Sequence, residues 1–320
     1  MRAAQVVTLT GPADVVVNDV PAPEPEDGKV LIRVEAVGVA FPDLLLSRGE
    51  YQMKPEPPFT VGADLAGTVI SGGGFEPGTR VCGCTGWGGA QEQVLADPSC
   101  VFPIPDSITF EQAAAIPMNY LTADFALFER GGLQPGETVL VHGAAGGLGT
   151  AVIQVAKGMG ATVIGVASTE EKRALVLECG ADHAIGLEGF KDAARELTGG
   201  RGVDVVADIV GGDIFTDSLR CLARQGRLIV LGFAAQQGIP SVKVNRLLFT
   251  NTDIRGAAWG EYWMANPGYM QEQWKRLEPM LGVAVQPPVG RTYSLAETGQ
   301  ALDDMDQRRA LGKLVVRVRD

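Results

Sequence analysis

The chain has 320 residues, 46% hydrophobic and 20% charged, which is enough apolar material for two packed domains. Its net charge of −11 lacks the basic excess that a nucleic-acid-binding protein needs, so we expect no nucleic-acid partner. No run of about 18 apolar residues predicts a membrane span and no secretion signal is visible, so we expect a cytoplasmic protein with no membrane partner.

The first third of the chain is predicted to be β-structure. Short segments rich in Val and Ile are separated by Gly and Pro turns, which is typical of a small barrel or sandwich. The expected strands are 15–20, 30–39, 62–70, a short one from 81, and 91–95. The pattern changes near residue 106, where helices are predicted at 109–115 and 119–130.

From residue 138 the predicted strands and helices alternate. Strands are expected at 138–142, 162–167, 183–185, 203–209 and 227–231, with helices at 149–159, 170–179 and 214–222. Such alternation indicates an α/β fold with a parallel sheet covered by helices. Two further helices, 270–281 and 295–308, and a closing strand, 313–318, are predicted after the alternation stops.

The most specific motif is TVLVHGAAGGLG at residues 138–149, a buried strand that runs into spaced glycines and then a helix. A dinucleotide pyrophosphate needs backbone N–H donors at a helix N-terminus. One glycine allows the sharp turn, a second the close approach of phosphate, and a third the packing of the helix on the strand. The predicted cofactor-binding residues here are Gly143, Ala145, Gly146, Gly147, Leu148 and Gly149.

The end of the following strand predicts which dinucleotide is bound. An enzyme that uses NAD usually places Asp or Glu about 20 residues after the glycine motif, where it holds the ribose 2′-hydroxyl. Ser168 stands there, followed by Lys172 and Arg173. A hydroxyl and a cation attract a 2′-phosphate, so NADPH is favoured over NADH, although Glu170 and Glu171 weaken the positive field.

The sequence resembles the medium-chain dehydrogenase/reductase superfamily, and within it the zinc-independent quinone oxidoreductases, the family of zeta-crystallin. The resemblance spans essentially the whole chain. It is carried by residues 38–51 (GVAFPDLLLSRGEY), 58–69 (PFTVGADLAGTV), 117–127 (PMNYLTADFAL), 133–149 (LQPGETVLVHGAAGGLG), 180–185 (GADHAI) and 312–316 (GKLVV).

This resemblance implies the domain organisation and the assembly. Residues 1–122 and 267–320 would form a GroES-like β-barrel domain that binds substrate, with a Rossmann dinucleotide-binding domain of residues 123–266 inserted between them. The family also implies a homodimer formed through the Rossmann domains.

The zinc branch of the superfamily carries a catalytic Cys and a Gly-His-Glu motif that this chain lacks. Ala40 or Phe41 stands at the Cys position and Ala63 at the His position. A catalytic zinc needs about three protein ligands, and the only histidines are His142 and His183. We predict no metal, and we interpret the one rival set as small core residues: Cys82, Cys84 and Cys100.

The resemblance therefore implies an NADPH-dependent quinone reductase that transfers a hydride without zinc. The family often has Asn at the position of Ala40, and in some members Tyr at the position of Leu45, but Tyr51 is retained. Tyr51 is our candidate for a substrate contact or proton donor, the alternative being a packing aromatic. Further cofactor contacts carried over from the family or from strand ends are Asn119, Thr122, Gly232, Phe233, Ala234, Trp259 and Lys313.

Two other functions remain open from the sequence. Reduction of an activated C=C bond, in a 2-enoyl thioester or an enone, uses the same fold and cofactor. A member of another class, an NADPH-binding sensor or structural protein with little turnover, would keep the dinucleotide motif without the chemistry.

Overall fold

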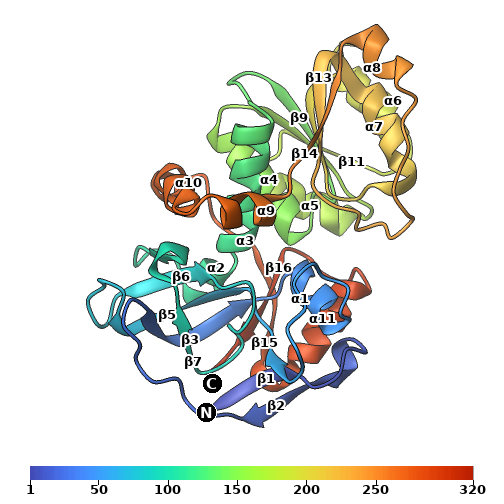
Figure 1. Ribbon diagram of the computed structural model, residues 1–320. Coiled ribbons are helices and arrows are strands. Elements are labelled where there is room, and N and C mark those ends of the chain that lie inside the picture. Colours follow the sequence, from blue (N-terminus) through green and yellow to red (C-terminus); the bar gives the residue numbers. More distant parts are fainter. Residues whose placement is uncertain (320) are drawn as a thin grey trace. The chain divides into compact units, whose positions relative to one another are not determined.

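The computed structural model describes residues 1–319 and divides into two compact units, each of which is described by itself. Unit 1 comprises Met1–Asn119, Pro267–Lys275 and the chain from Pro287 onward, and unit 2 comprises Tyr120–Asn266 and Arg276–Gln286. In Figure 1 blue and cyan strands of unit 1 therefore lie among red elements from the other end of the chain. The first third and the C-terminal segment thus fold together.

Unit 1 is built on a seven-stranded sheet and a smaller three-stranded sheet. The larger sheet has the order β15-β16-β3-β5-β6-β8, with β7 also paired to β3, and the smaller has the order β2-β1-β4. The strands are β1 Arg2–Val6, β2 Val15–Asp19, β3 Val30–Gly38, β4 Phe59–Thr60, β5 Asp64–Gly72, β6 Arg80–Cys84, β7 Gln93–Ala96, β8 Val101–Pro103, β15 Val289–Ser294 and β16 Lys313–Arg317. Its helices are α1 Phe41–Ser47, α2 Phe110–Ala114 and α11 Thr298–Asp306.

The strand β3 is the centre of unit 1. It pairs antiparallel with β5 from Val30 opposite Gly72 to Gly38 opposite Asp64, and β16 pairs with its other edge. All of its β-branched residues are buried and only Arg33 is exposed, as expected of a strand at the centre of a core. The pairing of β3 with β16 joins segments about 280 residues apart, which explains why the tail of the chain belongs to this unit.

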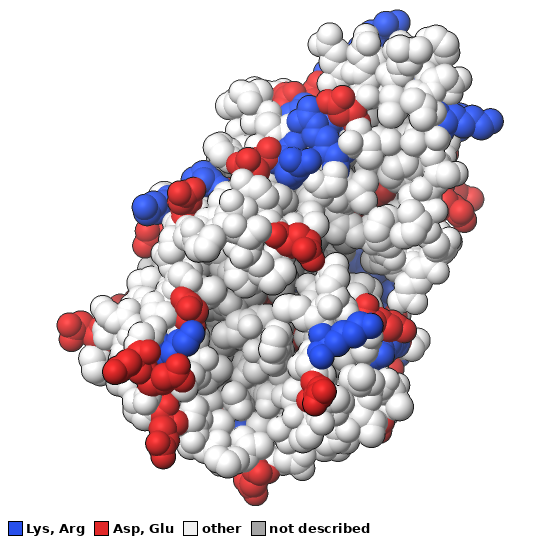
Figure 2. Space-filling model, viewed as in Figure 1, with Lys and Arg blue, Asp and Glu red and all other residues white. Residues whose placement is uncertain are grey.

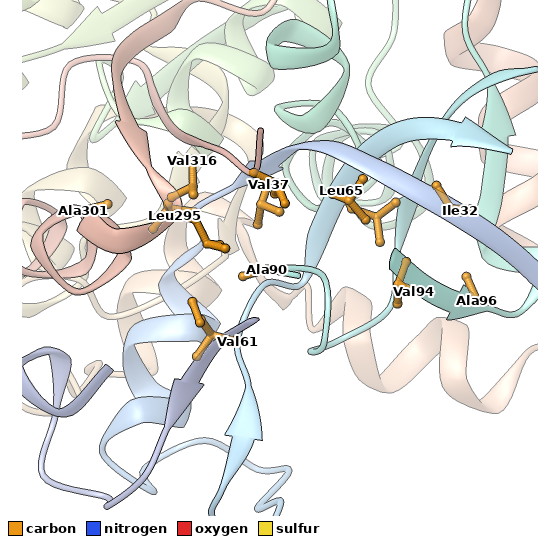
Figure 3. Close-up of a cluster of buried hydrophobic side chains, with 14 of the residues drawn as sticks. Ile32, Val37, Val61, Leu65, Ala90, Val94, Ala96, Leu295, Ala301 and Val316 are labelled. Atoms are coloured by element: carbon orange, nitrogen blue, oxygen red, sulfur yellow. The ribbon is translucent and has the colours of Figure 1, made fainter. Parts of the chain in front are cut away.

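A continuous apolar core fills the interior of unit 1. Figure 3 shows side chains from several strands and from α11 meeting in this core. Each fully buried Val or Leu contributes about 1.5–3 kcal/mol relative to an exposed one. Labelled members of the cluster are Ile32, Val37, Val61, Leu65, Ala90, Val94, Ala96, Leu295, Ala301 and Val316.

Unit 2 contains a six-stranded parallel sheet with the order β11-β10-β9-β12-β13-β14. The strands are β9 Thr138–His142, β10 Thr162–Val166, β11 His183–Ile185, β12 Val203–Asp208, β13 Leu222–Val230 and β14 Asp253–Gly256. The helices are α4 Gly147–Gly158, α5 Glu170–Glu178, α6 Phe190–Leu197, α7 Phe215–Cys221, α8 Asn245–Thr250 and α9 Trp259–Ala265. The chain runs outward from β9 to β11, then returns to β12 on the other side of β9. This doubly wound order confirms the expected α/β class, and its direction reverses between β9 and β12.

Two helices join the units in sequence. The segment expected as one helix at 119–130 is α3, Pro117–Asp124, followed by a π-helical stretch, Phe125–Arg130. The helix expected at 270–281 is α10, Tyr269–Leu277, followed by a short 3₁₀ turn at Glu278–Met280 that contains Pro279. Proline lacks the N–H that would continue the α-helical hydrogen bonding.

The two units differ from the expected boundaries in residues 120–122 and 276–286, which belong to unit 2. Arg276 donates two hydrogen bonds to the Asp124 carboxylate, at 2.7 and 3.0 Å. Gln154 Nε2 donates to the carbonyl of Gln286, whose own N–H donates back to Gln154 Oε1. These pairings hold the segment on unit 2.

Charged side chains of both signs occur across the surface that Figure 2 shows, where Lys and Arg are interspersed with Asp and Glu. No helix within residues 1–319 is both long and apolar enough to cross a membrane.

Candidate functional site

The loop between β9 and α4 has the geometry that its glycines predict. Gly143 has a φ of +63°, which favours glycine, and turns the chain off the end of β9. Gly146 then caps α4 with φ −84° and ψ 169°, and within residues 1–319 no side chain caps this helix N-terminus. The amides of the first helical turn, which have no intrahelical partner, are therefore available for an anion.

Gly149 allows α4 to lie directly on this loop. A Cβ at this position would stand 2.2 Å from the Gly143 carbonyl oxygen and 2.7 Å from the Ala144 Cα. Both neighbours are backbone atoms that cannot rotate away. The third glycine thus provides the close packing between helix and loop that the sequence motif predicts.

The end of β10 carries Ser168, whose hydroxyl is predicted to face the adenosine ribose. Ser168 is exposed after the strand, and Thr169 caps α5 by accepting a hydrogen bond from the Lys172 N–H at 3.2 Å. The side chain of Lys172 is half-buried on the first turn of α5. A carboxylate at the position of Ser168 would repel a 2′-phosphate, and none is present there.

Residues 232–234 lie at the same carboxyl edge of the sheet. The Leu231 N–H donates to the Asp208 carbonyl and the Ala234 N–H to the Ile209 carbonyl, which fixes this segment beside the end of β12. Phe233 is 41% exposed. The structure therefore brings Gly232, Phe233 and Ala234 to the sheet edge that also holds the glycine loop.

Two polar side chains at this edge are buried. The Ser218 hydroxyl donates to the Ile214 carbonyl and lies 2.8 Å from His142 Nε2, which assigns the ring proton to Nε2. Burial lowers the pKa of His142 to about 4, so the ring is neutral at physiological pH. Within residues 1–319, His142 Nδ1 and Asp208 Oδ2 have no hydrogen-bond partner.

Unit 1 contains a buried carboxylate cluster that the sequence reasoning did not single out. Asp43, 1% exposed, accepts hydrogen bonds from the backbone N–H groups of Ala40 at 2.8 Å, Gly62 at 3.0 Å and Ala63 at 3.1 Å. Burial raises the pKa of Asp43 to about 6, and the nearby Asp64 adds to the rise while the amide donors oppose it. The carboxylate ties the start of α1 to the segment before β5.

Asp64 forms the second half of this cluster. Its Oδ2 accepts from Lys313 Nζ at 2.8 Å and its Oδ1 from the Met118 N–H at 2.8 Å. The side chains of Asp64 and Lys313 are 0% and 4% exposed, so the ion pair is dry. Burial raises the pKa of Asp64, and the Lys313 ammonium opposes that rise. The ammonium group of Lys313, which was expected to reach the cofactor, therefore donates a hydrogen bond to the Asp64 carboxylate.

These contacts define what the cluster can do chemically. Asp43 uses both carboxylate oxygens on three backbone amides, and Asp64 uses both of its own on Lys313 and Met118. Groups bound in this way hold backbone segments in place rather than exchange protons with a substrate. A sequence signal was available, because an Asp inside an apolar run such as PDLLL or GADLAG implies a buried partner.

The remaining candidates lie in different environments. Tyr51 follows α1 and is partly buried against the core cluster of unit 1. Asn119 and Thr122 lie one turn apart on α3, which places them on one face of that helix. Trp259 begins α9 and is 3% exposed, with its ring centroid 5.9 Å from that of Trp263.

Side chains that could ligate a metal are dispersed. Within the part of the chain that the structure describes, no three His, Cys, Asp or Glu residues gather as a metal would need. The backbone N–H groups of Ala40 and Ala63 both donate to Asp43, but neither alanine side chain offers a ligand atom. The cysteines at positions 82 and 84 are buried free thiols in β6, and burial raises their pKa well above the usual value.

Comparison with known proteins agrees with this arrangement. Residues 26–106 match the alcohol dehydrogenase GroES-like domain family, and residues 147–280 match the zinc-binding dehydrogenase family. The bovine quinone oxidoreductase-like protein 2 is 37% identical over 98% of this chain and 92% of its own length.

Solved structures extend the comparison. A probable oxidoreductase from Mycobacterium abscessus is 43% identical, with a TM-score of 0.91 over 99% of both chains. The quinone oxidoreductase of Thermus thermophilus, solved alone and with NADPH, is 36% identical, with a TM-score of 0.87 over 99% of this chain and 100% of its own. The expected combination of a GroES-like domain and a Rossmann-type sheet is confirmed.

Proposed function

Because the chain belongs to the quinone oxidoreductase branch of the medium-chain dehydrogenase/reductase superfamily and is an oxidoreductase with a nicotinamide-type binding domain, we propose that it is an NADPH-dependent quinone reductase. The observation that carries the proposal is the glycine loop. Its three glycines allow a sharp turn, a helix N-terminus with no side-chain cap and a close contact between helix and loop, as a dinucleotide pyrophosphate requires.

The proposal assigns the phosphates and ribose of NADPH to unit 2. The pyrophosphate lies against Gly143, Ala145, Gly146, Gly147, Leu148 and Gly149. Ser168 and Lys172 receive the 2′-phosphate, because a hydroxyl and a cation favour a dianion there. The Thermus relative was solved with NADPH, which supports NADPH over NADH as the cofactor.

The nicotinamide ring supplies a hydride when the cofactor is bound, and a quinone accepts it at little cost because the product is aromatic. The role of the protein is then to bind and orient. We assign Gly232, Phe233 and Ala234, together with Asn119, Thr122 and Trp259, to cofactor contacts. Tyr51 is assigned to the substrate, as a contact or proton donor, and residues 1–122 and 267–320 to the substrate domain.

The reaction is proposed to need no zinc. Alanine stands at the positions of the Cys and His ligands of the zinc branch, and the backbone at Ala40 and Ala63 is held by a carboxylate instead. A quinone needs polarisation of its carbonyl by a Lewis acid less than an aldehyde does, and its reduction involves no alkoxide of the kind that zinc stabilises in alcohol dehydrogenases. Added zinc and strong chelators should both leave turnover unchanged.

A homodimer through the Rossmann domains completes the proposal. The strand β14 is one of the two edge strands of the parallel sheet within residues 1–319, and an edge strand offers unpaired backbone groups to a second chain. Unit 2 also exposes Ile239, Val244, Leu248 and Phe249, each at 70–76%. Apolar side chains that are exposed to this extent mark a surface for association. A monomeric mass by light scattering at micromolar concentration would contradict the dimer.

The test of the proposed activity is NADPH oxidation, followed at its absorbance band in the presence of a chelator. The substrates are a quinone, a 2-enoyl thioester and a simple enone, each measured also with NADH. Quinone turnover that prefers NADPH supports the proposal. Turnover of only the thioester or enone would assign the protein to C=C reduction, and NADPH binding without turnover would assign it a sensing or structural role.

A further inference from the structure

The ion pair between Asp64 and Lys313 joins three parts of unit 1 that are distant in sequence. Asp64 begins β5, Lys313 begins β16, and the Met118 N–H on the other Asp64 oxygen belongs to the first turn of α3. Both side chains are almost completely buried. A dry ion pair costs more desolvation than an apolar pair of the same size, so its presence here asks for a reason other than stability.

The geometry of Asp64 suggests that reason. One oxygen binds the ammonium and the other binds the Met118 amide, each at 2.8 Å, so the carboxylate cannot rotate without losing a bond. Lys313 thus fixes the direction in which Asp64 presents its second oxygen. That second oxygen fixes the backbone at residue 118.

The next residue is Asn119, which is 8% exposed and which the proposed function places against the cofactor. An amide side chain can orient a planar ligand only if its own backbone is held, because a small misplacement weakens its hydrogen bonds. Asp43, which binds the amides of Gly62 and Ala63, holds the chain immediately before Asp64 in the same way.

We propose that Asp64 and Lys313 are positioning residues that hold the Met118 backbone, and through it Asn119, in the orientation needed to bind the nicotinamide end of the cofactor. This inference rests on the proposed function, because that function assigns Asn119 to the cofactor. Neither Asp64 nor Lys313 touches the cofactor in this account. Both act through the backbone of residue 118.

The test uses two double variants that differ in whether residue 64 can accept a hydrogen bond from the Met118 N–H. In Asp64→Asn with Lys313→Met both charges are removed, and the asparagine oxygen can still accept from the Met118 N–H. In Asp64→Leu with Lys313→Met both charges are also removed, but no acceptor is left. Neither variant leaves a lone buried charge, which is what makes single replacements of a buried pair unfold proteins. Should the leucine variant not fold, Asp64→Ser with Lys313→Met replaces it, because serine is too short to reach the amide.

The readouts are kcat and KM for NADPH with a quinone, and the dissociation constant of NADPH from its fluorescence. The leucine variant should show at least tenfold lower kcat/KM than the asparagine variant at similar thermal stability. Asn119→Ala is then combined with each. We call the contacts of Asp64 with Lys313 and the Met118 N–H the clamp. Because the clamp acts through Asn119, Asn119→Ala should lower kcat/KM little further in the leucine variant but should have its full effect in the asparagine variant.

The outcomes separate the inference from the proposed function. Additive effects of Asn119→Ala and the leucine variant, or equal kcat/KM in the two double variants, would overturn the clamp. If the wild-type protein does not oxidise NADPH with any quinone, the proposed function fails instead. The same cycle is then read in the NADPH dissociation constant, where non-additivity still supports the clamp and additivity still overturns it.

Discussion

Replacing Gly146 by alanine tests the glycine loop without disturbing the fold. A Cβ at residue 146 would have its nearest neighbour, the Gly143 carbonyl oxygen, at 3.5 Å, an ordinary contact. The φ of −84° and ψ of 169° are extended values that alanine adopts freely. The stability of the free protein should therefore change by no more than about 1 kcal/mol, because alanine restricts the unfolded chain more than glycine but is a poorer helix N-cap.

The cofactor should respond in the opposite direction. A methyl group on the loop keeps the pyrophosphate from the backbone, and one lost hydrogen bond to a charged group costs about 1.5–3 kcal/mol. That corresponds to an increase in the NADPH dissociation constant of about 10- to 100-fold. Fluorescence titration measures the constant, and thermal unfolding without cofactor measures the stability.

A matched control comes from the same unit. Gly186 has no atom within 4 Å of a Cβ built on it, so Gly186→Ala should leave the NADPH dissociation constant unchanged and shift the stability by no more than about 1 kcal/mol. An unchanged NADPH dissociation constant in Gly146→Ala, with both variants folded, would refute the assignment of the pyrophosphate to this loop.

Three further predictions follow from packing, charge and burial. Gly149→Ala should lose about 1–3 kcal/mol of unfolding free energy in urea, because its Cβ would overlap the Gly143 carbonyl. A variant as stable as the wild type would show that the loop backbone can shift to accommodate the methyl group. Ser168→Asp should raise the NADPH dissociation constant at least tenfold and that of NADH much less, and equal changes would argue against a 2′-phosphate at this position. The stability of the wild type relative to His142→Gln should fall by about 3 kcal/mol as pH drops from 6.5 to 4, because the unfolded chain protonates His142 before the folded one, whose pKa is about 4. In the wild type this fall is largely offset by Asp43, whose folded pKa of about 6 against 3.8 makes its protonation stabilising, so a stability difference between the two proteins that does not change with pH would contradict the His142 assignment.

The features that the sequence predicted well are local in the chain. The glycine loop follows from spacing alone, because β9, the turn and the start of α4 are consecutive and each glycine has its own steric reason. The alternation of strands and helices from residue 138 similarly required only the apolar pattern. Both depend on neighbours within a few turns of chain.

The features that escaped prediction depend on distant or very short elements. Lys313 was carried over to the cofactor from the family, and no local pattern reveals that its ammonium group donates to Asp64, 249 positions away. The helices α1 and α8, with seven and six residues, are too short to display a helical period, and β14 has only four residues. Such elements are stabilised by tertiary packing, which a single sequence does not display.

The most direct test of the central claim is a single turnover. The protein is loaded with one equivalent of NADPH in the presence of a chelator and mixed with excess benzoquinone, with a protein-free mixture measured beside it. The account predicts loss of the NADPH absorbance, one hydride equivalent per chain, at a rate well above the protein-free reaction, and slow loss in Gly146→Ala at the same concentrations. Bound NADPH that is oxidised no faster than free NADPH would contradict it.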